Sequence, residues 1–270
     1  MKAISYGTKV CRNLESALTK EWWEENQKGA HAASSILGAN TKPEHGLLVV
    51  SGNQPSKKSL VLLSTLEETL FIGDQSYPLS TCLYANQTVF PKGYEYLEHF
   101  YKLPFPTWIF RAEGLALVKI VILMQDQPTV VIRYQLLSSY GDFVRFQIRP
   151  VVAFRPASQI VKGDAKRIPR LEAKPGEIHL EYSNSFPTLH FFHNAAVVDR
   201  SGKWLKHVRY TKNIASESGQ EEDLYSPCSL LYGFLKEDGV YLTASTSPEH
   251  GFDPFLVGVG EKNKRFSKKS

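Results

Sequence analysis

The 270-residue chain is long enough for one large all-β domain or two smaller domains. Its hydrophobic content of 42% is typical of a globular protein, and no apolar run approaches the roughly 18 residues that a membrane helix needs. Most of the net charge of +5 lies in the last ten residues, so the body of the chain is close to neutral. This distribution argues against nucleic-acid binding, which requires a basic surface on the folded domain.

Two further features of the composition concern the cellular compartment. The N-terminus lacks the continuous apolar segment of a secretory signal peptide. The three cysteines, Cys11, Cys82 and Cys228, are odd in number and far apart, which argues against a disulfide framework and for a reducing compartment. We therefore expect a cytoplasmic protein with no membrane partner.

The first predicted element is a short helix over residues 13–26, where the spacing of apolar side chains suits a helix. Beyond it the strongest periodicity is two, as in residues 129–137, where Val130 and Ile132 alternate with Val131 and Arg133. Residues 143–150 alternate in the same way, with Val144, Phe146 and Ile148 on one face and Phe143, Arg145, Gln147 and Arg149 on the other. Further strands are predicted at residues 46–50, 59–64, 68–73, 106–114, 115–125, 177–182, 188–193, 195–199, 229–235 and 240–245.

Three segments are predicted to be irregular. Residues 155–177 form a charged excursion between strands, and residues 213–225 form a polar loop with a helical turn. Residues 256–270 are expected to be a basic tail or the remnant of a linker. About a dozen strands with few short helices predict an all-β protein, a large antiparallel β-sandwich that occupies residues 1–255 as one domain.

No arrangement of residues in the sequence predicts a catalytic site, a metal site or a cofactor. His190 and His193 would point to opposite faces of one strand, which cannot clamp a single ion. A glycosidase needs two carboxyl groups that face each other across a sugar, and Glu67 and Glu68 would also point to opposite faces. The acidic run Glu221, Glu222 and Asp223 is interpreted as solvated charge in a loop.

Sugar binding suits the sequence better. Residues 90–110 are rich in aromatic side chains, whose faces can stack on sugar rings, although most of them are expected in the core. The segment before residues 46–50 combines Gly38, for a tight turn, with Asn40, whose side chain can bond the turn backbone, and Pro43, which restrains the loop. His45 would lie at the junction of this loop and the strand, as a ligand-binding or a structural residue.

Taken together, the motifs of this chain resemble the N-terminal domain of archaeal and bacterial-type glycogen debranching enzymes, the amylo-α-1,6-glucosidase family. The resemblance spans roughly residues 21–247. The segments that carry it are Gly38-Ala39-Asn40-Thr41 with His45-Gly46-Leu47-Leu48-Val49; Leu66-Glu67-Glu68; Pro91, Gly93, Tyr94, Leu97 and Phe100; Pro104, Pro106 and Trp108; Arg149-Pro150 with Ala153 and Arg155; and Glu222-Asp223-Leu224 with Ser226-Pro227.

The resemblance implies a mutarotase-like supersandwich and a function in glycogen breakdown. In the family this domain precedes an (α/α)6 barrel that carries the catalytic carboxylates, and the present chain stops where that barrel would begin. We therefore expect a non-catalytic module that recognises α-glucan, such as glycogen or a maltooligosaccharide, or docks onto a glucosidase barrel. The candidate residues for these contacts are Asn40, His45 and Arg149 as hydrogen-bonding groups, and Tyr94 and Trp108 as stacking surfaces.

One departure from the family pattern and two alternative functions remain open. The two basic residues and the tyrosine that precede the family's histidine are Lys42, Pro43 and Glu44 here, which would weaken any contact made by an arginine at this loop. A first alternative is a pure interaction domain whose exposed face, with Arg145, Gln147 and Arg149, packs on a separate helical catalytic subunit. A second is an independent mutarotase-like enzyme, which needs a histidine and a carboxylate facing each other in one groove.

Overall fold

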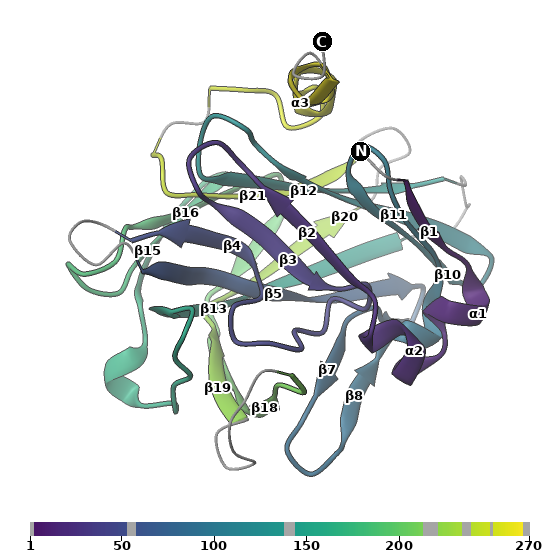
Figure 1. Cartoon of the computed structure of the whole chain (residues 1–270), viewed down its shortest axis with the longest axis horizontal. Helices are drawn as coiled ribbons and strands as arrows, with labels where there is room; N and C mark the ends of the chain where they lie inside the picture. Colours follow the sequence, from purple (N-terminus) through teal and green to yellow (C-terminus); the bar gives the residue numbers. More distant parts are fainter. Residues whose placement is uncertain are drawn as a thin grey trace.

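The computed structural model describes residues 3–52, 58–137, 144–212, 221–233, 239–248 and 251–266, and within these ranges the chain folds into two stacked antiparallel sheets (Figure 1). The predicted all-β sandwich is therefore confirmed. The order of the nine-stranded sheet is β1 (Ile4–Tyr6), β9 (Leu97–Lys102), β10 (Pro106–Ala112), β11 (Leu115–Leu123), β12 (Thr129–Leu136), β21 (Val240–Ser245), β16 (Leu189–His193), β15 (Glu177–Glu181) and β14 (Arg170–Lys174).

The ten-stranded sheet forms the second layer. Its main path is β17 (Val197–Asp199), β20 (Ser229–Gly233), β13 (Val144–Pro156), β5 (Ser59–Ile72), β4 (Gly46–Ser51), β3 (His31–Ser35) and β2 (Glu21–Glu25). Off this path lie β6 (Gln75–Pro78), β18 (Lys203–Arg209) and β19 (Glu221–Ser226). A separate hairpin, β7 (Thr81–Leu83) and β8 (Val89–Lys92), projects at the same end of the molecule as β18 and β19 (Figure 1), and Tyr84 after β7 bridges to Val208 in β18.

The core lies between the two sheets and follows the predicted alternation. In β12 the side chains of Val130 and Ile132 enter the main core, whereas Val131 packs in a smaller cluster on the outer face of the sheet. In β13 the core side chains are Val144, Phe146 and Ile148, and Arg145 points outward. Phe143, which was predicted to share the face of Arg145, lies outside the described residues. The two predicted strands at residues 59–64 and 68–73 form the single 14-residue strand β5.

The helix predicted over residues 13–26 is wrong for its second half. A helix α1 (Thr8–Cys11) and a helix α2 (Leu14–Leu18) pack at one end of the sheets near β1 and β9, but residues 21–25 form the edge strand β2. In β2 the side chains of Trp22 and Glu24 point inward, and the alternation is hard to recognise because Glu24 is charged. Its carboxylate is buried and pairs with Lys102 at 2.7 Å and with Arg265. Both partners are distant in sequence, so the local pattern alone could not predict this strand.

Residues 257–266, within the segment expected to be a basic tail, form helix α3 (Val257–Phe266), which lies against the outer face of the nine-stranded sheet (Figure 1). The buried carboxylate of Glu261 accepts a hydrogen bond from the backbone N–H of Gln125 at 3.0 Å. Arg265 donates to the carbonyl of Leu123 and lies over the ring of Phe105. These contacts hold the helix on the sheet, whereas the division of the chain at residue 255 stays a prediction.

The remaining short elements are two 3₁₀ turns, η1 (Gly93–Tyr96) and η2 (Ala165–Arg167). The second lies in the segment predicted to be an irregular excursion, residues 155–177. That prediction is wrong for residues 170–174, which form strand β14 and pair with β15. In the described part of the chain, the helices are all too short or too polar to cross a bilayer.

Candidate functional site

The loop between β3 and β4, residues 36–45, contains two of the five candidate residues, Asn40 and His45. Gly38 adopts a φ of +72°, a conformation that side chains rarely tolerate, so the predicted tight turn is present. Its carbonyl accepts a hydrogen bond from the hydroxyl of Thr65 at 3.2 Å, which holds the turn on β5. The loop is thus fastened to β5, and its residues Ile36, Leu37 and Ala39 belong to the main core.

Asn40 fastens this loop to two strands. Its Oδ1 accepts from the hydroxyl of Ser34 in β3 at 2.8 Å, and its Nδ2 donates to the carbonyl and hydroxyl of Ser64 in β5, each at 3.1 Å. The sequence predicted a bond to the turn backbone, but the side chain instead bridges neighbouring strands. Because both ends of the amide have protein partners, Asn40 positions the loop.

His45 lies at the junction of the loop and β4, as predicted, but it is only 2% exposed. Its Nδ1 accepts a hydrogen bond from the backbone N–H of Thr41 at 3.3 Å, and its Nε2 lies 3.9 Å from the carboxylate of Glu21. Burial lowers the pKa of His45 to about 4, and the attraction of Glu21 offsets only part of this effect. The imidazole is therefore neutral at pH 7 and stabilises the loop from within.

Glu21, on the edge strand β2, gathers the cations around this loop. Its carboxylate accepts hydrogen bonds from Lys42 and Lys212, each at 2.9 Å, and from the hydroxyl of Thr41 at 3.1 Å. Partial burial raises the pKa of Glu21, but these hydrogen bonds together lower it to about 2. Lys42, which stands where the family has a basic residue, is thus held in an ion pair that is about one quarter exposed.

A buried cluster of Arg155, Tyr210 and Glu222, here called the Arg155 cluster, ties the loop to the sheet from the other side. Arg155 and Glu222 are both fully buried and make two hydrogen bonds to each other. The guanidinium also donates to the carbonyl of Pro43 at 2.8 Å and to the hydroxyl of Tyr210 at 3.1 Å. Two motif segments 67 positions apart in the sequence therefore meet in one closed, mutually satisfied network.

The interpretation of Glu221, Glu222 and Asp223 as solvated charge in a loop is wrong, because these residues belong to strand β19. Glu222 enters the Arg155 cluster, and Asp223 is buried and accepts hydrogen bonds from the backbone N–H groups of Gly163 and His207, at 2.8 and 2.9 Å. Residues 213–220, the first part of the same predicted loop, lie outside the described residues.

Trp108 is a core residue with 3% exposure, so its predicted role as an open stacking surface is not supported by its position. Its ring packs edge-on against Trp22 and Phe100, and its Nε1 donates to the carbonyl of Ile36 at 2.6 Å, at the start of the same loop. Tyr94 lies in η1, partly buried against the core. Asn40, His45 and Trp108 therefore act on one loop, and Tyr94 belongs to a different element.

Arg149 lies on the outward face of β13, as the alternation predicted. It donates to the carbonyl of Ser201 at 3.1 Å and lies 3.8 Å from the carboxylate of Asp199. On the same face Arg145 is exposed, whereas the amide of Gln147 donates to the hydroxyl of Ser229 at 2.7 Å. This face is polar, and it lies on a different part of the sheet from the loop at residues 36–45.

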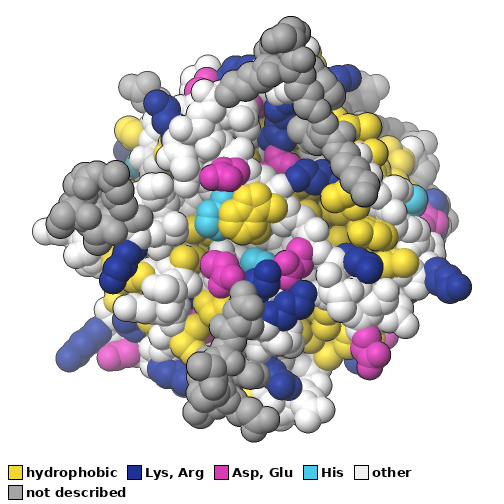
Figure 2. All heavy atoms as spheres, in the orientation of Figure 1, with side chains coloured by type: hydrophobic (Ala, Val, Ile, Leu, Met, Phe, Trp, Pro, Cys, Tyr) yellow, Lys and Arg dark blue, Asp and Glu magenta, His cyan; other side chains and the backbone are white. Residues whose placement is uncertain are grey.

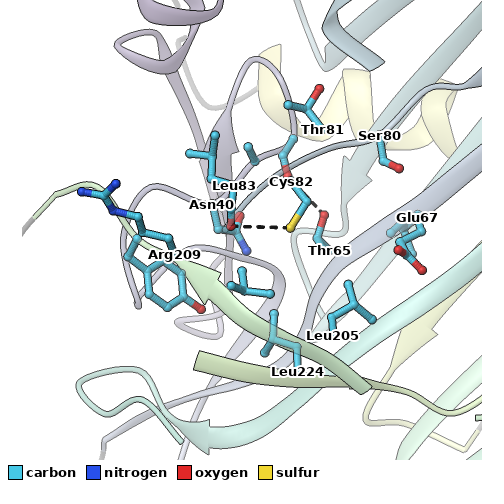
Figure 3. A pocket seen from close by; sticks show the side chains of 15 residues that line it. Asn40, Thr65, Glu67, Ser80, Thr81, Cys82, Leu83, Leu205, Arg209 and Leu224 are labelled. Atoms are coloured by element: carbon cyan, nitrogen blue, oxygen red, sulfur yellow. Dashed lines mark hydrogen bonds between the residues drawn. The ribbon is translucent and has the colours of Figure 1, made fainter. Parts of the chain in front are cut away.

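A small internal cavity lies beneath Asn40 (Figure 3). The side chains of Asn40, Thr65, Cys82 and Leu205 surround it, from the loop and from β5, β7 and β18. Its volume of about 30 Å³ suits one or two water molecules. Typical ligand pockets measure about 300–1,000 Å³, so this cavity cannot hold a glucose unit.

The exposed side of the same region carries an aromatic surface that the sequence reasoning missed. Trp23 is 46% exposed, and its ring stacks on that of His31 in β3 with centroids 4.2 Å apart and planes 16° apart. Glu21 and Glu25 flank Trp23 on the same face of β2, and Lys42 pairs with Glu21. Figure 2 shows charged side chains gathered around a hydrophobic side chain and a histidine over this part of the molecule. We call these five residues the Trp23 surface.

The period-two pattern of residues 21–25 was the available signal for this surface. A strand places Glu21, Trp23 and Glu25 on one face, and the predicted helix at residues 13–26 hid that arrangement.

The buried carboxylates in the described ranges all have internal partners. Glu24 pairs with Lys102 and Arg265, and Glu68 pairs with Lys119 at 2.7 Å and accepts from Tyr134. Glu222, Asp223 and Glu261 are bound as described above. Glu67 and Glu68 do point to opposite faces, since Glu67 pairs with Lys203 outside the core.

Histidines and carboxylates meet at the surface in two further pairs. His179 lies 3.4 Å from Glu177, and the exposed His207 lies 2.9 Å from Glu221. His190 packs against His179, whereas His193 accepts from the backbone N–H of Ala195. In the parts of the chain that the structure describes, no three metal-ligating side chains converge.

The fold and the site define a large β-sandwich domain whose buried acids serve its framework and whose loop at residues 36–45 is held from both sides. The family described as "Glycogen debranching enzyme N terminal" matches residues 20–241. The chain therefore belongs to this family.

A solved structure of a putative kojibiose phosphorylase from human microbiome is similar over 99% of this chain, with 9% sequence identity and a TM-score of 0.39. This chain spans 36% of the length of that protein. No curated protein matches the chain significantly.

Proposed function

We propose that this domain is a non-catalytic module of the debranching type, which recognises α-glucan for an amylo-α-1,6-glucosidase barrel or docks onto that barrel during glycogen breakdown. The match of residues 20–241 to the debranching-enzyme N-terminal family is the observation that carries the proposal. The barrel, of the (α/α)6 type, would supply the catalytic acids. The module would supply binding surface and orientation for the glucan.

The state of the acidic residues supports a non-catalytic role. Glycosidic cleavage uses two carboxyl groups about 5–10 Å apart on opposite sides of the scissile bond, and at least one must reach the sugar. The buried carboxylates in the described ranges are bound by cations or backbone amides of the domain itself. Releasing one of them for chemistry would leave a buried cation or donor unpaired, which is costly.

The docking alternative has its own observation. Arg145 is exposed on the outward face of β13, and its guanidinium lies 5.3 Å from the ring centre of Phe71 on the neighbouring strand β5. An arginine stacked on an aromatic ring is a frequent component of protein interfaces. A pure interaction domain would use this face, with Arg149, to pack on a separate helical catalytic subunit.

The test is a paired measurement on the purified chain. Glucose release from a phosphorylase limit dextrin is assayed over hours, and maltohexaose is titrated calorimetrically. We expect saturable binding with no glucose release above a buffer blank. Turnover of the limit dextrin would overturn the non-catalytic assignment.

A second arm separates glucan recognition from docking. If maltohexaose does not bind, but a separately expressed glucosidase barrel co-elutes with the chain and Arg145→Glu abolishes the complex, the interaction domain is correct. An increased rate of interconversion of glucose anomers would instead indicate the mutarotase-like enzyme.

A further inference from the structure

The Trp23 surface carries the most exposed of the four tryptophans of the chain. Trp22 and Trp108 are 2% and 3% exposed and serve the core, and Trp204 is partly buried and packs on Tyr225. Trp23 leaves almost half of its side chain open to solvent. Exposing an indole forgoes the favourable burial of a large apolar surface. Tryptophan is also, with tyrosine and arginine, enriched among the surface residues that dominate binding energy at protein interfaces. Trp23 is therefore the first aromatic residue to consider as a ligand contact.

The indole of Trp23 is held in place before any ligand arrives. One ring face stacks on His31, whose Nε2 donates to the carbonyl of Glu44 at 3.1 Å. The backbone carbonyl of Trp23 accepts a hydrogen bond from Lys102, which fastens the open edge of β2 to the other sheet. A ligand that binds the remaining ring face would lose little free energy in ordering the site.

The polar groups around the ring match a sugar. Glu21 and Glu25 stand two residues to either side of Trp23 on one strand face, hence about 7 Å from it along the strand. Carboxylates accept hydrogen bonds from the hydroxyl groups of a sugar, and the ammonium of Lys42 can donate to the hydroxyl oxygens. The apolar C–H face of a pyranose ring can meanwhile stack on the indole. A hexose-binding site combines a flat aromatic face with hydrogen-bonding groups around it, and the Trp23 surface has both.

The charges favour a neutral ligand. Glu21 is already paired with Lys42 and Lys212, and Glu25 adds one negative charge near His31. The surface therefore lacks the field of a single sign that steers phosphates, nucleic acids or acidic peptides. It also differs from the centre of a protein interface, where charged residues are depleted. A neutral, polyhydroxylated chain suits a surface that has charged groups but no field of a single sign.

We propose that the Trp23 surface is an α-glucan-binding site, at which a glucose ring stacks on Trp23 and its hydroxyl groups bond to Glu25 and Lys42. The inference rests on the proposed glucan-recognition function and adds its location. The surface borders the loop at residues 36–45 through Lys42 and through the bond of His31 to the carbonyl of Glu44. Asn40 and His45, the residues that the sequence favoured, instead hold that loop through internal hydrogen bonds.

The experiment is a calorimetric titration of maltohexaose into the full chain and three variants. Trp23→Ala removes the stacking face, Trp23→Phe keeps a smaller one, and Phe90→Ala removes an aromatic residue that is 66% exposed on β8. We expect at least a tenfold loss of affinity for Trp23→Ala, a smaller loss for Trp23→Phe and no change for Phe90→Ala. Thermal unfolding of each variant, compared with that of the unmodified chain, establishes that it is folded.

Each outcome bears on a different part of the proposal. If the unmodified chain binds maltohexaose and Trp23→Ala binds equally well, the location is wrong and the glucan-recognition function stands. If the unmodified chain binds no maltohexaose, both are wrong. If binding is absent but Trp23→Ala abolishes a complex with a glucosidase barrel, the surface is a protein contact and the glucan site is overturned.

Discussion

The Arg155 cluster and the Trp23 surface flank the same loop and use their polar groups in opposite ways. In the cluster, Arg155 and Glu222 are fully buried and satisfy each other. On the surface, Trp23 is fixed on one face by His31 and is 46% exposed. The cluster has no remaining capacity to bind a ligand, whereas the surface is rigid and open. Residues of the family motifs thus build the framework, and our proposal assigns the glucan contact to a neighbouring residue outside those motifs, Trp23.

The comparison predicts first that the Arg155 cluster dominates stability. Glu222→Ala leaves the buried guanidinium of Arg155 without its carboxylate, and we expect the free energy of unfolding to fall by about 3–5 kcal/mol. Urea unfolding followed by circular dichroism measures the loss. The matched control is Glu172→Ala, which removes an exposed partner of Arg170 and should leave stability nearly unchanged. Equal effects of the two variants would show that the cluster is not a framework element.

Asn40 should have the next largest effect. Asn40→Ala removes three hydrogen bonds and leaves polar groups of Ser34 and Ser64 without their partner, so we expect a loss of about 1–3 kcal/mol in the free energy of unfolding. The same denaturant titration measures it. Because Asn40 positions the loop, its removal should lower the affinity for glucan only to the extent that it displaces the loop. If Asn40→Ala abolished maltohexaose binding while unfolding stayed unchanged, Asn40 would be a ligand contact after all.

A third prediction concerns pH. Since burial lowers the pKa of His45 from 6.5 to about 4, the unfolded chain takes up a proton that the folded chain does not bind between these values. Stability should therefore fall on acidification, by about 2 kcal/mol between pH 7 and pH 5 for this residue. Glu21 stays ionised in this window because its pKa is about 2.

The measurement is denaturant unfolding at both pH values for the unmodified chain and for His45→Gln, which cannot take up the proton. His193, whose burial also lowers its pKa to about 4, is retained in both proteins and cancels in the difference. An identical pH dependence of the two proteins would contradict the assignment of His45 as a buried neutral side chain.

The smallest effect on stability is expected at the surface. Trp23→Ala removes the stack on His31 and the buried half of the indole, and should lower the free energy of unfolding by about 1–2 kcal/mol. The useful quantity is the difference in unfolding free energy between this variant and Glu222→Ala, because substituting a binding residue should lower affinity more than stability. A loss as large as that of Glu222→Ala would place Trp23 in the framework instead.

The sequence predicted the sandwich because its alternation is local. Residues 129–136 and 144–148 alternate between core and outer face as expected, and no distant contact is needed to recognise that pattern. The exceptions depend on tertiary partners. Glu24 in β2 is tolerated inside only because Lys102 and Arg265 reach it. Helix α3 contains Gly258 and Gly260, which disfavour a helix, and it is held by contacts of Glu261 and Arg265 with the sheet.

The candidate site was predictable to a smaller extent. The turn at Gly38 and the position of His45 followed from residue types, but the burial of His45 and Trp108 did not. Whether a side chain reaches a ligand or another part of the protein depends on its tertiary neighbours. Here Asn40 bonds to Ser64, His45 lies beside Glu21, and Trp108 bonds to the carbonyl of Ile36. The Trp23 surface remained hidden because its strand was interpreted as a helix.

The most direct test of the account uses the indole N–H signals of the four tryptophans in a ¹⁵N-labelled chain, recorded while maltohexaose is added. Trp23→Phe assigns its own signal by deletion. We predict a saturable shift of the Trp23 signal and no comparable shift for Trp108, whose Nε1 donates to the carbonyl of Ile36 in the core. A Trp23 signal that does not move at saturating maltohexaose, or one that moves less than that of Trp108, would contradict glucan recognition at this surface.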